Sequence, residues 1–253
     1  MPSDRFYFNG PLSGQISLKD AEFHHLRVMR ISLNETLEIV NGQGALATAK
    51  LISLDKHTAH LQVLQSHTTP RPPHQIILAI PYMRPAKLEL IIEKGTELGA
   101  DAFHIYPAAH SEKTVLSSNQ LERLRNLSIS ALKQSGRLYL PSLQLVTSIQ
   151  ELTHPILYGD TSPNAPSLLT TDLSQITTFI TGPEKGFTAE EIALLAKKGK
   201  GVSLNPNVLR AETAPLAALS VLALRNLHTI IMNQKIDDTS NRSNVAKQSK
   251  MNF

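Results

Sequence analysis

The pattern of apolar and polar positions divides the chain into two regions of different type. In the first, short alternating segments predict strands at residues 5–9, 36–40, 45–54 and 58–64. Asn41-Gly42 is a strong turn signal between two of them. One short helix interrupts the strands, with Asp20 as its expected N-cap and Arg30 near its end. This spacing predicts a compact β-barrel domain over residues 1–70.

A proline-rich segment, residues 69–73, reads as a linker, because consecutive prolines are stiff and remove backbone donors. Beyond it, apolar segments of strand length alternate with amphipathic helices. The expected strands are residues 76–80, 102–106, 143–146, 156–158, 178–181 and 202–204. The expected helices are residues 85–98, 120–134, 188–198 and 212–227. This alternation predicts an α/β domain with a mainly parallel, buried sheet over residues 74–228, followed by a polar, disordered tail at 233–253.

Composition narrows the classes of protein that remain. The 253 residues include no Cys, which excludes disulfides, thiolate metal sites and a cysteine nucleophile. We find no apolar run near the ~18 residues of a membrane span and no signal peptide, so we expect a cytoplasmic protein without membrane contact. The net charge of +4 permits binding to nucleic acid without arguing for it.

Two loops that follow expected strands have the composition of ligand sites, because ligands of open α/β sheets bind beyond the carboxyl ends of strands. The first, residues 181–187, reads Thr-Gly-Pro-Glu-Lys-Gly-Phe and leads into a capping box formed by Thr188 and Glu191. Its glycines allow close approach of a ligand, whereas Glu184 would repel a phosphate. The loop therefore favours a neutral or partly cationic ligand; a tight turn without a ligand is the other interpretation.

The second loop, residues 204–214, feeds the last expected helix. Arg210 and Glu212 lie near the start of that helix, where a carboxylate is favoured and a cation is not. An arginine in this place suggests a functional task, with an ion pair to Glu212 as the alternative. The helix itself alternates small residues with leucines, which suits close packing against a helix of the same subunit or of a partner.

Three further clusters have weaker signals. Gln134-Ser135-Gly136-Arg137 reads by composition as the end of a helix with an exposed arginine. Three acidic residues spaced by four, Glu89, Glu93 and Glu97, read as a solvated helix face. His24-His25 has no third ligand nearby, so we expect no metal site, and with Arg27 and Arg30 it forms a polar surface that could face RNA.

Taken in order, these motifs resemble the bacterial 16S ribosomal RNA uridine-N3 methyltransferase family of the SPOUT superfamily. The resemblance covers about residues 5–227. It rests on segments that begin with His24-His25-Leu26-Arg27, Lys94-Gly95-Thr96-Glu97, Gln134-Ser135-Gly136-Arg137, Gly182-Pro183-Glu184-Lys185 and Leu209-Arg210-Ala211-Glu212. It implies a PUA-like N-terminal barrel that binds RNA, and a trefoil-knotted α/β domain that binds S-adenosylmethionine. It also implies a homodimer with the active site at the subunit interface, acting on 16S rRNA or the small ribosomal subunit.

The resemblance assigns roles to individual residues. Arg210 and Glu212 become the catalytic candidates. The cofactor-binding candidates are Leu157, Tyr158, Gly159, Thr181, Gly182, Pro183, Glu184, Gly186, Leu204, Asn205, Val208, Leu209, Thr213 and Ala214. The RNA-binding candidates are His24, His25, Arg27, Arg30, Arg84, Gln134 and Arg137.

The chain departs from the family pattern at three positions, because the family usually has Gly at Lys185, Gly at Asn205 and Thr at Ala211. A positive φ at Lys185 would cost about 1 kcal/mol relative to Gly.

The reaction implied is methyl transfer from S-adenosylmethionine to N3 of an unpaired or extruded uridine, with Arg210 stabilising negative charge on the ring oxygens. A non-catalytic RNA-binding or ribosome-assembly protein on the same fold, and a ribose 2′-O-methyltransferase, are the alternatives.

Overall fold

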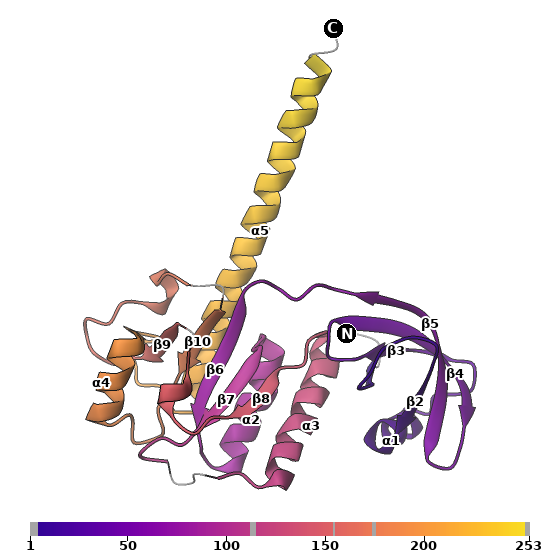
Figure 1. Cartoon of the computed structure of the whole chain (residues 1–253), viewed down its shortest axis with the longest axis horizontal. Helices are drawn as coiled ribbons and strands as arrows, with labels where there is room; N and C mark the ends of the chain where they lie inside the picture. Colours follow the sequence, from indigo (N-terminus) through magenta and orange to yellow (C-terminus); the bar gives the residue numbers. More distant parts are fainter. Residues whose placement is uncertain (1–4, 112–114, 154, 174–175, 251–253) are drawn as a thin grey trace.

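The computed structural model describes residues 5–111, 115–153, 155–173 and 176–250, with side chains described as far as residue 232. Figure 1 shows two sheets side by side, each with its own helices, and a long C-terminal helix that projects away from both. The two sheets are built from consecutive parts of the chain, strands β1 to β5 and strands β6 to β11.

The N-terminal sheet is a curled, PUA-like half-barrel with the strand order β1-β3-β4-β5-β2. Its strands are β1 (Arg5–Tyr7), β2 (Gln15–Lys19), β3 (Thr36–Val40), β4 (Ala45–Leu54) and β5 (Thr58–Thr68). Alternate residues of these strands point inward and bury an apolar core that includes Phe6, Ile39, Leu51 and Leu61. Helix α1 (Asp20–Val28) closes this core with Leu26.

Two local expectations for this sheet are wrong. Strand β2 is absent from the sequence prediction, because it offers only Ile16 and Leu18 as buried residues and gains its order from antiparallel pairing with β5. Asp20 is not the N-cap of α1: it is the first helical residue, with φ 48°, and the N-cap is Lys19, whose side chain makes no capping hydrogen bond.

The second sheet has the order β11-β9-β10-β6-β7-β8, and every neighbouring pair of strands is parallel. Its strands are β6 (Gln75–Pro81), β7 (Ala102–Tyr106), β8 (Ser142–Leu145), β9 (Ile156–Gly159), β10 (Ile176–Ile180) and β11 (Gly199–Val202). The expected α/β domain with a buried parallel sheet is therefore confirmed. The strand expected at 202–204 lies earlier in the chain, because Gly199 and Lys200 already pair with β9.

Helices cover both faces of the parallel sheet. Leu78 and Ile80 of β6 point to the face covered by α2 (Pro85–Leu98), α3 (Ser118–Ser135) and the start of α5 (Thr213–Lys250). Ala79, between them, points to the opposite face, where α4 (Ala189–Lys198) contributes Leu195. Two short 3₁₀ turns, η1 (Ile149–Glu151) and η2 (Leu168–Thr170), lie in the loops between strands. The near-continuous apolar sequence of β6 is thus explained by burial on both faces.

The helix ends follow the expected signals. Pro85 occupies the first turn of α2, and Gly99 ends that helix with φ 107°, a value that favours glycine. Thr188 and Glu191 form the expected capping box of α4. Helix α3 begins two residues earlier than expected, because Ser117 and Gln120 form a second capping box there.

Helix α5 continues into the segment expected to be a disordered tail and extends to Lys250, while residues 251–253 lie outside the described residues. No Gly or Pro follows Pro215 in the sequence, so nothing in the backbone chemistry ends the helix near Leu227, where the expected helix stops. The helical spacing of the apolar residues therefore marks the buried part of α5 and not its end. Figure 1 shows the later turns extending beyond the rest of the fold.

The part of α5 at Thr213–Met232 is long and apolar enough to cross a membrane by length and composition alone. This differs from the expectation that no such segment exists. Ala218, Leu219 and Leu222 within it are fully buried against the parallel sheet and its helices. Core helices of soluble proteins pass the same test, so the segment is weak support for a membrane span.

A short backbone seam joins the two parts of the molecule. Gly44 N donates to Leu138 O and Leu140 N donates to Gly42 O, each at 2.9 Å. Both glycines have positive φ, 69° at Gly42 and 93° at Gly44, and a Cβ at Gly44 would overlap the Tyr139 hydroxyl. Glycine is therefore required here both by conformation and by close approach.

Candidate functional site

The carboxyl ends of β9, β10 and β11 open onto one large cavity of about 900 Å³. Because these strands are parallel neighbours, the loops that follow them meet at the same edge of the sheet. The cavity lies between the loop at 158–162, the loop at 181–187 and the loop at 204–214, with Lys87 of α2 at its wall. The two loops that the sequence singled out thus lie together.

The cavity gathers most of the predicted site residues. Both catalytic candidates, Arg210 and Glu212, line it. The cofactor candidates that line it are Tyr158, Gly159, Thr181, Gly182, Pro183, Glu184, Gly186, Leu204, Asn205, Val208, Leu209 and Ala214. Two candidates do not: Leu157 is buried in the core, and Thr213 lies exposed at the first position of α5.

Sequence reasoning missed several residues of the cavity wall. Lys185, Phe187, Asn207 and Ala211 lie in the two predicted loops but were given no role, and Lys87, Asp160, Thr161, Ser162, Ile192 and Val202 lie outside those loops. Residues 160–162 directly follow the cofactor candidates Leu157, Tyr158 and Gly159, so extending that set by three residues would have found them. Asp160 accepts hydrogen bonds from Ser162 N at 2.8 Å and Ser162 Oγ at 2.6 Å, which closes a tight turn. Lys87 carries no such signal, because it comes from a helix distant in the sequence.

The loop at 181–187 has no backbone strain at Lys185, the position where the family usually has Gly. Among the described non-glycine residues, positive φ occurs only at Asp20, Arg30 and Asn34, so neither Lys185 nor Asn205 adopts it. Gly186 has φ 74° and donates its N–H to Pro183 O at 2.8 Å. The left-handed position of the turn is therefore Gly186, and the departure at Lys185 costs no backbone strain.

Thr181 lines the cavity and carries a buried hydroxyl group. Its backbone is fixed, because its carbonyl accepts from the Tyr106 hydroxyl at 2.6 Å and its N–H donates to Ala79 O at 3.1 Å. Its side chain is buried, at 3% exposure, and Oγ1 has no hydrogen-bond partner in the described part of the chain. A buried polar atom usually has a partner, so this hydroxyl fits a cavity that holds a polar ligand.

Lys87 forms ion pairs with two of the acidic residues that line the cavity. Its Nζ lies 2.8 Å from Glu184 Oε1 and 3.0 Å from Glu212 Oε2. The hydrogen bond from Lys87 lowers the pKa of Glu184. Because one lysine is shared by two carboxylates, a net negative charge remains here, which agrees with the expectation that the loop would repel a phosphate.

Glu212 is ionised despite its burial, with 13% of its side chain exposed. Burial raises its pKa, but its own backbone N–H, Lys87 and Arg210 together lower it below the usual value. The ion pair between Arg210 and Glu212, which was the alternative to a functional task for Arg210, is not formed among the described residues, and Glu212 pairs with Lys87 instead. The exposed Arg210 forms no ion pair within the described residues and is available to a ligand.

The predicted RNA-binding residues fall into separate places. On α1, His24 and Arg27 are exposed and so is Arg30 just beyond it, while the ring of His25 packs against Phe6 at 4.8 Å. In Figure 1, α1 lies at the far end of the molecule from β9 and β10. Arg84 is exposed at the N-cap of α2, close enough to Glu184 to lower its pKa.

Arg137 differs from the exposed arginine that composition suggests. Its guanidinium donates to Thr96 O at 2.8 Å and Ala100 O at 2.7 Å, at the end of α2, and lies 3.8 Å from Asp101. Burial lowers the pKa of Arg137. The structure thus engages Arg137 inside the protein, whereas Gln134 one turn earlier is exposed.

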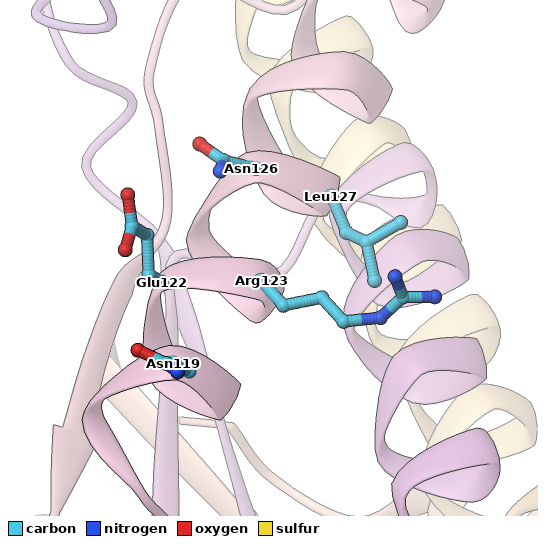
Figure 2. Close-up of a pocket in the computed structure, with 5 residues that line it drawn as sticks. All are labelled: Asn119, Glu122, Arg123, Asn126 and Leu127. Atoms are coloured by element: carbon cyan, nitrogen blue, oxygen red, sulfur yellow. The ribbon is translucent and has the colours of Figure 1, made fainter.

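A second, smaller cavity of about 420 Å³ lies along α3, lined by Asn119, Glu122, Arg123, Asn126 and Leu127. Figure 2 shows the Arg123 side chain extending from α3 toward the neighbouring helix. It ends on Glu89 of α2, with both carboxylate oxygens bound at 2.5 and 2.9 Å. The acidic face of α2 is therefore paired with cations and not simply solvated, and this cavity collects no group of catalytic residues.

Comparison with known proteins gives consistent matches over both parts of the chain. A family profile described as an RNA methyltransferase domain matches residues 70–223, and one described as an RNA methyltransferase PUA domain matches residues 18–64. Ribosomal RNA small subunit methyltransferase E of Rickettsia conorii is 30% identical over 242 residues, which cover 90% of this chain and 98% of the relative. The protein of the same name from Bacillus subtilis is 30% identical and covers 82% of this chain and 89% of its own.

Two similar solved structures contain S-adenosylmethionine. A methyltransferase of Legionella pneumophila, solved with this bound cofactor, is 25% identical with a TM-score of 0.81, covering 89% of this chain and 98% of that one. Ribosomal RNA small subunit methyltransferase E of Neisseria gonorrhoeae, also bound to S-adenosylmethionine, is 28% identical with a TM-score of 0.77 and covers 87% and 97%.

Proposed function

The chain belongs to the RNA methyltransferase family that includes the ribosomal RNA small subunit methyltransferase E proteins, and from that we propose that it methylates N3 of a uridine in 16S ribosomal RNA. It is an S-adenosylmethionine-dependent ribosomal RNA methyltransferase with a PUA-like domain. The choice of N3 and of uridine is the finer part of the proposal. It comes from the family resemblance, and Arg210 at the wall of the cavity can stabilise the negative charge that N3 methylation develops.

The cavity suits S-adenosylmethionine, which when bound supplies a methyl group on a positively charged sulfur. The Thr181 hydroxyl offers an unused hydrogen bond, and Asp160 offers a carboxylate at the same wall. Glu184 and Glu212 lie nearby but are paired with Lys87. The residues present can therefore hold a polar ligand of mixed charge, and we propose that the cofactor candidates that line the cavity hold it.

Methylation of N3 requires a group that accepts the N3 proton and a group that stabilises the negative charge on the ring oxygens. The N3–H bond breaks and an N3–carbon bond forms, while the methyl group leaves its sulfur, so a proton leaves the base and negative charge develops on its ring oxygens. Arg210 stabilises that charge from the cavity wall. Glu212 is ionised and stands two residues away in the same loop, so it is the candidate acceptor for the proton. Since N3 lies on the Watson–Crick edge, the base must be unpaired or extruded first.

Substitution of Arg210 tests the assignment. We expect Arg210→Ala to lower kcat on small-subunit RNA by about 10²–10³-fold, the usual effect of removing one charge-stabilising donor, while the Kd for S-adenosylmethionine stays unchanged. Arg125→Ala, an exposed arginine of α3, is the matched control and should retain wild-type turnover. Normal turnover of Arg210→Ala would contradict the assignment.

Mass spectrometry of ribosomal RNA methylated by the wild-type protein identifies the target atom. A methyl group on the uracil ring supports the proposal, whereas a methyl group on ribose supports a 2′-O-methyltransferase. Calorimetric titration with S-adenosylmethionine addresses the non-catalytic alternative. An RNA-binding assembly protein on this fold would show no binding at high cofactor concentration.

We also propose that the protein is a cytoplasmic homodimer that associates through α5. Leu224, Leu227 and Ile231 follow each other at helical spacing and are 66%, 52% and 40% exposed. An apolar stripe of this kind on a helix that projects from the fold is typical of an interface. The trefoil knot and the RNA-binding role of the α1 surface stay predictions from the family resemblance.

A further inference from the structure

Lys87 is the one cation of α2 that reaches the cavity, and it links segments that lie far apart in the sequence. It comes from the first turn of α2, after β6, while Glu184 follows β10 and Glu212 follows β11. Its ammonium group lies within 3.0 Å of both carboxylates, and 28% of its side chain is exposed. One ammonium group therefore connects the two loops that form the opposite walls of the cavity.

The position of Lys87 is electrostatically unfavourable within its own helix. The N-terminal turn of a helix carries the positive end of the dipole, which disfavours a cation, and the first turn of α2 contains no acidic residue. Both compensating carboxylates come from other elements. Lys87 donates a hydrogen bond to Glu184 and forms an ion pair with Glu212, and these two carboxylates raise the pKa of Lys87.

We propose that Lys87 is a positioning residue for methyl transfer, which ties the Glu184 and Glu212 loops together and fixes the Glu212 carboxylate beside Arg210. This inference rests on the proposed function, because its consequence appears in the transfer step. Lys87 acts through Glu212 and Arg210 and is not itself assigned to the reacting atoms.

Removing the ammonium group changes the charges around Glu212 in a predictable direction. The charged groups near Glu212 are Lys87 from α2 and Arg210 from its own loop, and Glu184 shares the same lysine. Arg84, at the start of α2, acts on Glu184. Without Lys87, Glu212 stays largely buried and keeps only Arg210 as a nearby cation, so its pKa rises.

The test compares three variants of the full-length protein. Lys87→Met keeps the aliphatic stem and removes the charge, and Lys87→Arg restores the charge. Lys94→Met is the matched control, since Lys94 also bridges two carboxylates of α2, Glu93 at 2.9 Å and Glu97 at 2.8 Å, outside the cavity. Each variant is assayed for Tm, for Kd of S-adenosylmethionine, and for kcat on small ribosomal subunits as a function of pH.

We expect Lys87→Met to lower kcat at neutral pH on the order of tenfold and to move the acid limb of the pH profile to higher pH. Recovery of the wild-type profile in Lys87→Arg, with no change in Lys94→Met, supports the proposal. A purely structural role would lower Tm and leave the pH profile in place. An unchanged kcat, or a lower kcat with an unmoved profile, overturns the proposal. Wild-type turnover, measured first, tests the proposed function separately.

Discussion

Thr181→Val separates the contribution of one hydroxyl to ligand binding from its contribution to the fold. Thr181 stands directly after β10, and its backbone is held on both sides by Tyr106 and Ala79. Valine has nearly the same shape and favours extended backbone, so the change leaves these contacts intact. The only group removed is Oγ1, which is buried and has no partner among the described residues.

We expect Thr181→Val to stabilise the free protein and to weaken its binding of S-adenosylmethionine. A buried hydroxyl without a partner costs about 1–3 kcal/mol, so we expect the free variant to be more stable by about 1 kcal/mol. For a domain of this size that corresponds to a rise in Tm of about 2–4 °C. A hydrogen bond from this hydroxyl to S-adenosylmethionine contributes about 0.5–1.5 kcal/mol, so its loss raises Kd by about 2–12-fold.

Calorimetric titration with S-adenosylmethionine and thermal unfolding without it measure the two effects on the same samples. Thr96→Val is the matched control, because the Thr96 hydroxyl is equally buried but already donates to Ile92 O at 2.7 Å inside α2. The control should lose stability and keep its affinity. A Thr181→Val protein with lower Tm and unchanged Kd would refute the reasoning, because the hydroxyl would then have a partner within the fold.

Three shorter predictions follow from other contacts. Leu227→Glu on the exposed stripe of α5 should convert a dimer to a monomer in light scattering, and a variant that stays dimeric contradicts the α5 interface. Arg137→Met should lower the free energy of unfolding in urea by about 2–3 kcal/mol, because two carbonyl oxygens at the end of α2 lose a charged donor; a loss below that of an exposed ion pair would show that the contact is weak. The pKa of Glu212 is lowered in the fold, so its carboxylate stabilises the protein above its usual pKa and this contribution disappears as pH falls through the lowered value. Glu212→Gln should therefore lower Tm at pH 7 and flatten the fall of Tm as pH drops below the usual glutamate pKa of 4.5, which a pH series of unfolding curves checks.

The sequence predicted the elements whose signals are local. Helix α2 was predicted at its observed bounds, because Pro85 and Gly99 mark its ends and its apolar residues recur at helical spacing. The two cavity loops were predicted for a similar reason, since each follows a strand and leads into a helix. Strand β2 and the seam between the sheets were missed, because their order comes from pairing with residues far away in the sequence.

The difference between Arg137 and Arg210 shows why local composition is insufficient to assign a cation. Both arginines stand near a helix end, and both belong to motifs that carry the family resemblance. Arg137 follows the end of α3 and meets the carbonyl end of α2, whose free oxygens attract a cation, so the fold itself satisfies it. Arg210 precedes α5, where the helix end repels a cation, and the carboxylate that could pair with it is held by Lys87 instead. An arginine at a cavity wall that forms no ion pair with the described residues can bind a ligand without first losing an existing interaction. Which arginine this is depends on Lys87, a residue more than a hundred positions away.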